Sequence, residues 1–247
     1  MISVENLHFA YGRKSVLNGV DLQLPPGSLT AVCGVNGCGK STLLKCLCRL
    51  LKPTAGAVKL NGTMLGDFSR RELAQCVAFM GQDCSGGDNF TVAELVAMGR
   101  FAFGSSGRED IVAEVMKLAG VESLRSRRLS SLSGGERQRA FFALALAQTP
   151  RILLLDEPFS ALDPAGVREM MGVLQHLKTE QKLSIVMVVH DLNLALHAAD
   201  ILLGLRSGKV AFCAPPGECA AALPELFSLP ENLLQSGSDG RKYLFPW

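Results

Sequence analysis

The chain of 247 residues is 48% hydrophobic, so it can bury a full core as one large domain or as a domain with a subdomain. Its formal net charge of +2 argues against nucleic-acid binding, and the dense basic cluster Arg125, Arg127 and Arg128 is more simply a solvated helix end. The eight cysteines form no C-x-x-C pair, which indicates reduced thiols in a cytosolic protein rather than disulfides or a zinc site.

The hydropathy pattern contains no stretch that we expect to cross a membrane. The amino-terminal residues lack the basic and then apolar layout of a secretory signal. The charge-free run over residues 22–39 has spanning length, but Pro25, Pro26 and four glycines forbid a continuous membrane helix. We therefore expect a protein that is soluble by itself.

Residues 2–9 and 16–24 show partial alternation of apolar and polar side chains, which predicts two strands joined by a turn at Gly12. Tyr11 lies in this turn. Its ring could either stack on a flat base or cover the edge of a sheet.

The segment Gly34–Thr42 fits the pattern G-x-x-x-x-G-K-[ST] of a loop that wraps the phosphates of a nucleotide. A strand is predicted before it over Leu29–Cys33 and a helix after it over Leu43–Leu51, which is the setting that the motif requires. Its glycines let backbone N–H groups approach an anion, Lys40 supplies a positive charge for the β- and γ-phosphates, and the Ser41 hydroxyl can bind Mg²⁺. A glycine-rich turn that binds nothing is the alternative.

Cys38 lies inside this loop, near the predicted helix N-terminus, where a thiolate is favoured. This placement suggests that alkylation of Cys38 blocks nucleotide binding. The simpler alternative is a thiol that only fills space.

The stretch after the loop alternates short strands and helices. Strands are predicted over Val58–Leu60 and Val77–Met80, and helices that begin with capping boxes over Ser69–Ala74 and Val92–Met98. Residues 83–148 show helical patterns and no convincing strand, so we predict a helical subdomain inserted into a sheet domain.

The segment Ser130–Glu136 opens a helix that is predicted over Arg137–Ala147. Gly134 and Gly135 at its entry lower helix stability, and they make sense where bare backbone N–H groups must meet an anion. A capped helix after a tight turn is the alternative.

The apolar run Ile152–Leu155 predicts a strand buried on both faces, and Asp156 and Glu157 follow at its carboxyl end, where ligands bind in open α/β sheets. A Mg²⁺ ion would relieve the repulsion between these two carboxylates. His190 follows the next buried strand, Leu183–Val189, in the same way, so one crevice could receive all three side chains.

The rest of the chain completes a single predicted domain. Helices are expected over 165–180 and 192–199, strands over 201–205 and 209–213, and a short helix over Ala220–Phe227 in a tail without evident chemistry. The predicted organisation is a sheet core of residues 1–82 and 149–213, a helical subdomain of residues 83–148, and a tail of residues 214–247.

Taken in order, these motifs resemble the ATP-binding subunit of an ABC transporter. The matching segments are Gly34–Thr42, Gln82, Leu132–Glu136 with Gln138 and Arg139, Ile152–Glu157, Ser160–Asp163 and His190. The Leu-Ser-Gly-Gly-Glu signature separates this family from other P-loop proteins. The resemblance implies an α/β fold: a P-loop NTPase (ABC ATPase) core with a mixed sheet, an antiparallel β subdomain and an inserted helical subdomain.

The resemblance also implies a head-to-tail homodimer that holds each ATP between the phosphate loop of one copy and the signature of the other. Glu157 would polarise the attacking water, His190 would contact the γ-phosphate, and Asp163 would contact the partner copy. Gln82 would join Ser41 and Asp156 in binding Mg²⁺ and would relay dimer closure to a membrane partner. The implied ATP-binding residues are Tyr11, Gly34, Asn36, Gly37, Cys38, Gly39, Lys40, Ser41, Thr42, Ser133, Gly134 and Gly135.

Within this family, stretches such as Thr91–Arg100 resemble the ATPases of importers for ferric siderophores, haem and vitamin B12. The resemblance implies ATP-driven uptake of an iron chelate through an integral membrane permease, from the inner face of the cell membrane, with a substrate-binding protein as an indirect partner. Val35 and Gly81 each replace a proline that is common in this subfamily. Residues 101–109 form a segment that is shorter than usual and rich in Gly and Ser, and the tail after 210 matches the subfamily poorly.

Other functions stay open at this point. A soluble ABC ATPase that acts in DNA repair or on ribosomes would usually carry a coiled-coil insertion or a second cassette, and the chain shows neither. A transport subunit for another substrate, or a P-loop kinase, would share the phosphate loop, but a kinase would not need the signature.

Overall fold

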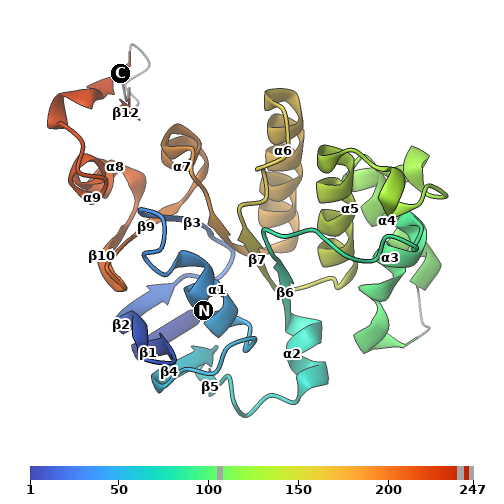
Figure 1. The fold of residues 1–247 in the computed structure, drawn as a ribbon, viewed down its shortest axis with the longest axis horizontal. Coiled ribbons are helices and arrows are strands. Elements are labelled where there is room, and N and C mark those ends of the chain that lie inside the picture. The colour runs from blue at the N-terminus through green and yellow to red at the C-terminus, as the bar shows by residue number, and fades with distance from the viewer. Residues whose placement is uncertain (105–107, 238–241, 245–247) are drawn as a thin grey trace. The chain divides into compact units, whose positions relative to one another are not determined.

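The computed structural model describes residues 1–104, 108–237 and 242–244 (Figure 1). The chain forms two compact units. The first unit contains Met1–Asp67 and Val186–Trp247, and the second contains Phe68–Ile185. Among the described helices, none combines the length and the apolar character needed to cross a membrane.

The first unit contains an antiparallel sheet with the strand order β2-β1-β4-β5. Its strands are β1 (Ile2–Tyr11), β2 (Lys14–Leu24), β4 (Ala55–Leu60) and β5 (Thr63–Met64). The alternation of apolar side chains in β1 and β2 buries one face of the sheet. The two strands predicted around Gly12 are therefore confirmed, with bounds that reach closer to the turn.

The first unit also holds part of a mixed sheet. The wholly buried strand β3 (Leu29–Cys33) pairs in parallel with β9 (Ile201–Arg206), which pairs antiparallel with β10 (Lys209–Ala214). Helix α1 (Lys40–Leu47) follows β3. It begins and ends earlier than predicted, because the glycine loop leads directly into it and Arg49, with φ of 60°, stops it.

The carboxyl-terminal part of the first unit contains short elements. Helix α7 (Leu192–Ala198) is followed, after β10, by α8 (Pro216–Cys219), α9 (Leu223–Leu226) and a hairpin of β11 (Leu234–Ser236) and β12 (Lys242–Leu244). The short helix expected over Ala220–Phe227 is confirmed in part, since the stretch is helical but is not a single α-helix. A 3₁₀ turn and α9 occupy this stretch, and Pro224 lies at the start of α9, where proline is tolerated.

The second unit begins with α2 (Arg70–Cys76) and β6 (Val77–Met80), which pairs in parallel with β7 (Ile152–Asp156). Helix α6 (Pro164–Gln181) follows β7, and the chain returns to the first unit within β8 (Ser184–Val188). The capping box predicted for α2 is confirmed: Ser69 and Glu72 exchange hydrogen bonds between side chain and backbone.

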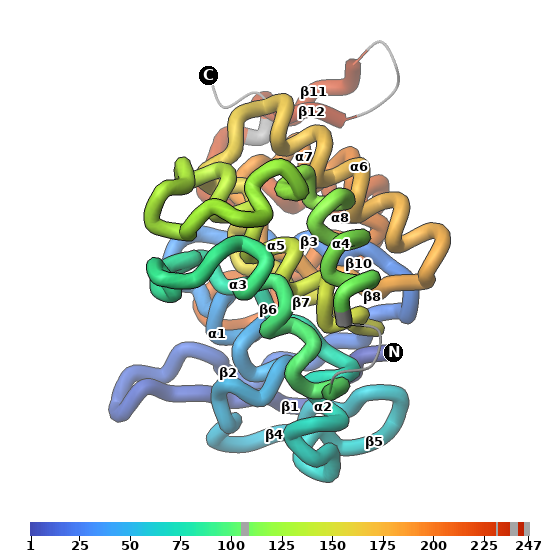
Figure 2. Tube along the Cα trace, turned by 90° about the vertical axis from the view of Figure 1, so that its right-hand side faces the viewer, coloured from blue at the N-terminus to red at the C-terminus, as the bar shows by residue number. Residues whose placement is uncertain are grey.

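Within the second unit, α3 (Val92–Met98), α4 (Arg108–Leu118) and α5 (Gly134–Ala147) pack side by side (Figures 1 and 2). Their shared core includes the fully buried side chain of Phe142. Residues 83–148, as far as the structure describes them, contain helices and no strand, as predicted. The short 3₁₀ turns span Phe101–Phe103, Glu122–Leu124, Leu129–Ser131 and Glu231–Leu233.

Candidate nucleotide site

The loop Gly34–Gly39 connects the end of β3 to the start of α1 and depends on glycine for steric reasons. Gly34 has φ of 149°, and a Cβ there would clash with the carbonyl oxygen of Leu205. Gly39 caps α1 with φ of 112°, and a Cβ there would lie 2.8 Å from Cδ2 of Leu17. The sequence therefore folds the backbone closely around the space in front of the helix.

Lys40 lies at the first position of α1 and is only 6% exposed. Its ammonium donates to the carbonyl oxygens of Gly34, at 2.7 Å, and Val35, at 3.1 Å. The loop leads directly into the N-terminus of α1, where the positive end of the helix dipole lies and where the backbone N–H groups point toward the loop. Positive charge and backbone donors thus converge at one helix end, which is the arrangement that binds phosphate.

Tyr11 is the last residue of β1 rather than part of the turn, and it is 50% exposed. Its ring meets the ring of Phe9 edge to face, with 4.8 Å between the ring centroids. This contact orients the ring and leaves its surface accessible, so the geometry suits stacking on a planar base.

In the second unit, the two carboxylates that end β7 lie in different environments. Asp156 is the last residue of the strand and is 2% exposed, whereas Glu157 is partly exposed and has a left-handed backbone, with φ of 54°. The amide nitrogen Nε2 of Gln82 donates to Oε2 of Glu157 over 2.8 Å. A left-handed backbone is uncommon for a residue with a Cβ, so its surroundings hold this residue in place.

Gln138 on α5 holds the loop that follows Glu157. Its side chain is 3% exposed, and its Nε2 donates to the Glu157 carbonyl oxygen and to the Ser160 hydroxyl, each at 3.2 Å. Its Oε1 accepts from the Ala161 N–H at 3.0 Å. The sequence placed Gln138 in a motif without giving it a role, because these partners lie far along the chain.

The signature segment starts α5 with a capping box. The Ser133 N–H donates to the Glu136 carboxylate at 2.7 Å, and the Ser133 hydroxyl accepts from the Glu136 N–H. Backbone and side-chain hydrogen bonds from Ser133 lower the pKa of Glu136. Gly134 and Gly135 thus become the first residues of the helix, and their N–H groups have no intrahelical acceptor.

Asp163 lies at the start of a helix, whereas His190 lies in the short connection between β8 and α7. Asp163 is the exposed N-cap of α6, and its carboxylate accepts from the Gly166 N–H at 2.8 Å. His190 is exposed directly after Val189, and Asp191 after it caps α7. An Asp residue directly before a helix is typical of an N-cap, so the capping roles of Asp163 and Asp191 could have been predicted from the sequence.

The expected thiolate at Cys38 is wrong. The side chain is buried, and this burial raises the pKa of the Cys38 thiol, although Lys40 opposes the shift. All eight cysteines are free, in agreement with the predicted reduced thiols.

The predicted site residues fall into two groups, one in each unit. Tyr11, the residues of the segment Gly34–Thr42 and His190 belong to the first unit, and the remaining predicted residues belong to the second. The structure brings Gln82 into direct contact with Glu157, whereas the side-chain contact of Ser133 is with Glu136.

Residues 17–160 match the family model described as ABC transporter. The chain is 38% identical over 215 residues to the iron(3+)-hydroxamate import ATP-binding protein FhuC of Bacillus subtilis, which covers 85% of this chain and 80% of the relative. It is 42% identical over 226 residues to the hemin import ATP-binding protein HmuV of Pseudomonas aeruginosa, which covers 88% of each.

The chain is also similar to solved structures of an ABC transporter cassette. A dimeric structure of the bacterial ABC transporter cassette MJ0796 matches with a TM-score of 0.80 and 30% identity, over 87% of this chain and 99% of that one. A post-hydrolysis dimer of the same cassette, bound to ADP and phosphate, matches with a TM-score of 0.79 and 28% identity, over 87% of this chain and 99% of that one.

Proposed function

The chain belongs to the ABC transporter family, and from this membership we propose that it is the ATP-hydrolysing subunit of an importer for an iron chelate. The predicted family and α/β fold class are confirmed. The proposed substrate class rests on the similarity of the chain to relatives that are named as ATP-binding proteins for the import of iron(3+)-hydroxamate and hemin. A ferric siderophore, haem or a related chelate is therefore the proposed cargo.

We propose that ATP binds with its phosphates at the segment Gly34–Thr42 and its base on Tyr11. The support is the meeting of the Lys40 ammonium and the glycine-rich loop at the N-terminus of α1, together with the half-exposed ring at the end of β1. The buried thiol of Cys38 packs inside this loop, and Asn36 lies exposed at its tip.

Ser41, Gln82 and Asp156 are the proposed ligands of Mg²⁺. A hydroxyl, an amide oxygen and a carboxylate are the hard oxygen donors that this ion prefers, so the donor set fits. When bound there, Mg²⁺ would supply positive charge that offsets the negative charge developing in phosphoryl transfer. The amide nitrogen of Gln82 is engaged by Glu157, which directs the choice of metal ligand to its carbonyl oxygen.

Glu157 is the proposed residue that polarises the attacking water, and His190 is proposed to contact the γ-phosphate. The support for Glu157 is its restrained geometry: Gln82 holds its carboxylate and Gln138 holds its carbonyl oxygen. Phosphoryl transfer depends mainly on positioning and charge neutralisation, which side chains held in this way provide.

We further propose a head-to-tail homodimer in which Ser133, Gly134 and Gly135 bind the ATP held by the partner copy. The N–H groups of the two glycines lack intrahelical acceptors, so the start of α5 favours an anion. Asp163, exposed at the start of α6, would contact the partner copy. A single copy then holds an incomplete site, and hydrolysis requires dimer closure.

The proposed membrane partner is a permease at the inner face of the cell membrane, which in turn would receive cargo from a substrate-binding protein. A groove of about 480 Å³ on the second unit supports this docking. Apolar Phe90 and Met98 line it, with Glu94 and Arg125 among its charged residues. Phe101, 93% exposed, follows α3 in the sequence but is not among the residues that line this groove.

Reconstitution tests the proposed transport function. The chain would be co-expressed with a candidate integral membrane permease and assembled in vesicles. ATP supplied on the side of this subunit should drive uptake of a ferric hydroxamate or of haem, and the Glu157→Gln complex should not. Uptake of vitamin B12 alone would contradict the proposed cargo, and a failure to associate with any permease would contradict the transport role.

A further inference from the structure

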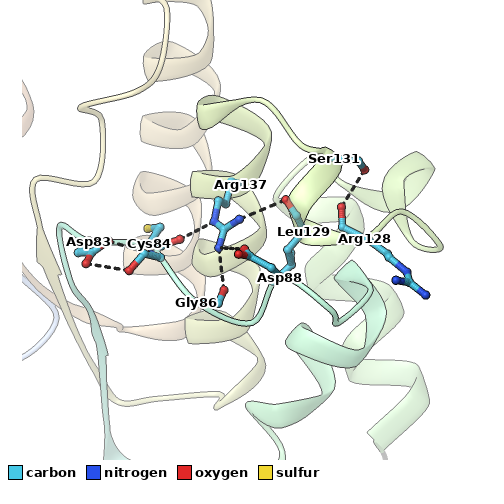
Figure 3. Close-up of polar contacts among 9 residues, drawn as sticks. Asp83, Cys84, Gly86, Asp88, Arg128, Leu129, Ser131 and Arg137 are labelled. Carbon is cyan, nitrogen blue, oxygen red and sulfur yellow. Dashed lines mark hydrogen bonds and ion pairs between the residues drawn. The ribbon is translucent and has the colours of Figure 1, made fainter.

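Arg137, on the first turn of α5, binds the segment that follows Gln82 (Figure 3). Its Nε donates to the Cys84 carbonyl oxygen at 2.6 Å, and its Nη2 donates to the Gly86 carbonyl oxygen at 2.7 Å. The same Nη2 pairs with the Asp88 carboxylate at 2.9 Å. One guanidinium therefore fixes three successive points of this segment.

The other side of the guanidinium contacts a second segment. Its Nη1 donates to the Leu129 carbonyl oxygen at 3.2 Å, and the Leu129 N–H donates to the Phe90 carbonyl oxygen at 3.0 Å. The two chain segments before α3 and before α5 thus run beside each other, and Arg137 bonds to both.

This arrangement depends on the shape of the arginine side chain. The side chain is 19% exposed, and its planar fork offers donors in several directions at once. A lysine could keep the charge beside Asp88, but its single nitrogen could not occupy both positions from which Nε bonds Cys84 and Nη2 bonds Gly86.

Only Asp83 separates the anchored Cys84 from Gln82 along the chain. The Asp83 carboxylate accepts from both the N–H and the hydroxyl of Ser85, so this short connection is itself held by hydrogen bonds. A shift of Arg137 would therefore move the backbone that carries Gln82, whose side chain contacts Glu157.

We infer that Arg137 is a positioning residue for ATP hydrolysis: it ties the start of α5 to the Gln82 segment and so keeps Gln82 against Glu157. When ATP draws the start of α5 toward the partner copy, Arg137 passes that displacement to the Gln82 segment. This inference rests on the proposed roles of Glu157 and of the signature segment.

The structure suggests a direct chemical test. A hollow of about 450 Å³ beside Arg137 is lined by Gln82, Gln138 and Gly134 as well. Truncation in Arg137→Ala would enlarge it enough for a free guanidinium ion to enter and to bond the same carbonyl oxygens.

The experiment compares the steady-state ATPase of the full chain with that of Arg137→Ala. We expect kcat to fall about tenfold or more, with KM for ATP unchanged, and millimolar methylguanidinium to restore part of kcat. Methylammonium at the same concentration should restore nothing. Arg71→Ala is the matched control, since Arg71 donates to a single carbonyl oxygen, that of Ala102, in the same unit.

An unchanged kcat, or a loss that methylguanidinium cannot restore, would overturn the inference. If Arg137→Ala does not fold, Arg137→Lys keeps the charge and should still lose kcat at an unchanged Tm. Normal turnover of Arg137→Lys would also overturn the inference.

Glu157→Gln distinguishes a failure of the proposed catalytic role of Glu157 from a failure of the positioning role of Arg137. If Glu157→Gln keeps its turnover, the proposed catalytic role fails, whereas if only Arg137→Ala keeps it, the positioning role fails alone.

Discussion

The side-chain amide of Gln82 donates a hydrogen bond to the carboxylate of Glu157 over 2.8 Å. This bond links the residue proposed to activate water with the segment that Arg137 anchors to α5. The ability of Glu157 to activate water would therefore depend on the position of the start of α5. The proposed dimer closure displaces this part of the helix.

Glu157→Gln should abolish turnover while leaving the site assembled. The amide oxygen of the new side chain can still accept from Gln82, but it cannot take a proton from water. We expect kcat to fall on the order of a hundredfold or more, ATP binding to persist, and an ATP-bound dimer to accumulate. Phosphate release and size-exclusion chromatography with ATP measure these effects, and near-normal turnover would show that another group activates the water.

Gln138→Leu should destabilise the second unit. It leaves the Ala161 N–H without its partner and removes one of two donors to the Glu157 carbonyl oxygen, the other being the Ser160 N–H, at a cost of about 1–3 kcal/mol. Thermal unfolding would measure the loss. Gln75→Leu is the control, because Gln75 makes a single bond, to the Ala102 carbonyl oxygen, and should cost less. Equal stability of the two variants would contradict the role given to Gln138.

Gly34→Ala should abolish ATP binding, whereas Gly172→Ala should raise the stability of the fold. A Cβ at Gly34 meets the Leu205 carbonyl oxygen, so the loop must distort and ATP binding should be lost. A Cβ at Gly172, inside α6, meets nothing within 4 Å, so alanine should stabilise the helix by about 0.5–1 kcal/mol. Nucleotide titration and thermal unfolding give the two results, and normal ATP affinity of Gly34→Ala would refute the steric argument.

Cys38 should react slowly with a maleimide at neutral pH. Burial raises the pKa of its thiol, so the reactive thiolate is scarce near pH 7 and grows about tenfold for each pH unit until that pKa is reached. Mass spectrometry of the labelled peptides would compare it with the part-exposed Cys76. If Cys38 is labelled faster than Cys76 at neutral pH, its thiol is activated, as the sequence suggested, and burial does not suppress its reactivity.

Local signals predicted much of the fold. Strands β3 and β6 and helix α3 have the predicted bounds, because short apolar runs and a capping box mark them within a few residues. The start of α5 was placed too late because glycine lowers helix propensity, whereas the capping box of Ser133 and Glu136 compensates for it.

Contacts between distant residues could not be predicted in this way. The hairpin of β11 and β12 is held by the Asn193 side chain, which bonds both the N–H and the carbonyl oxygen of Leu244. The roles of Gln138 and Arg137 likewise depend on partners far along the chain. No local pattern records such pairs, although the resemblance to the ABC family did assign roles to both Gln82 and Glu157.

The central claim is that two copies complete each other's ATP sites, and mixed subunits test it most directly. One subunit would carry Ser133→Arg and the other Lys40→Ala, each with Glu157→Gln to stop hydrolysis and a tag on only one of them. We predict that neither subunit dimerises alone with ATP, and that the mixture forms ATP-dependent dimers of one tagged and one untagged copy, since one composite site is then intact. A mixture that stays monomeric with ATP, or a Ser133→Arg subunit that pairs with itself as well as its parent does, would contradict the claim.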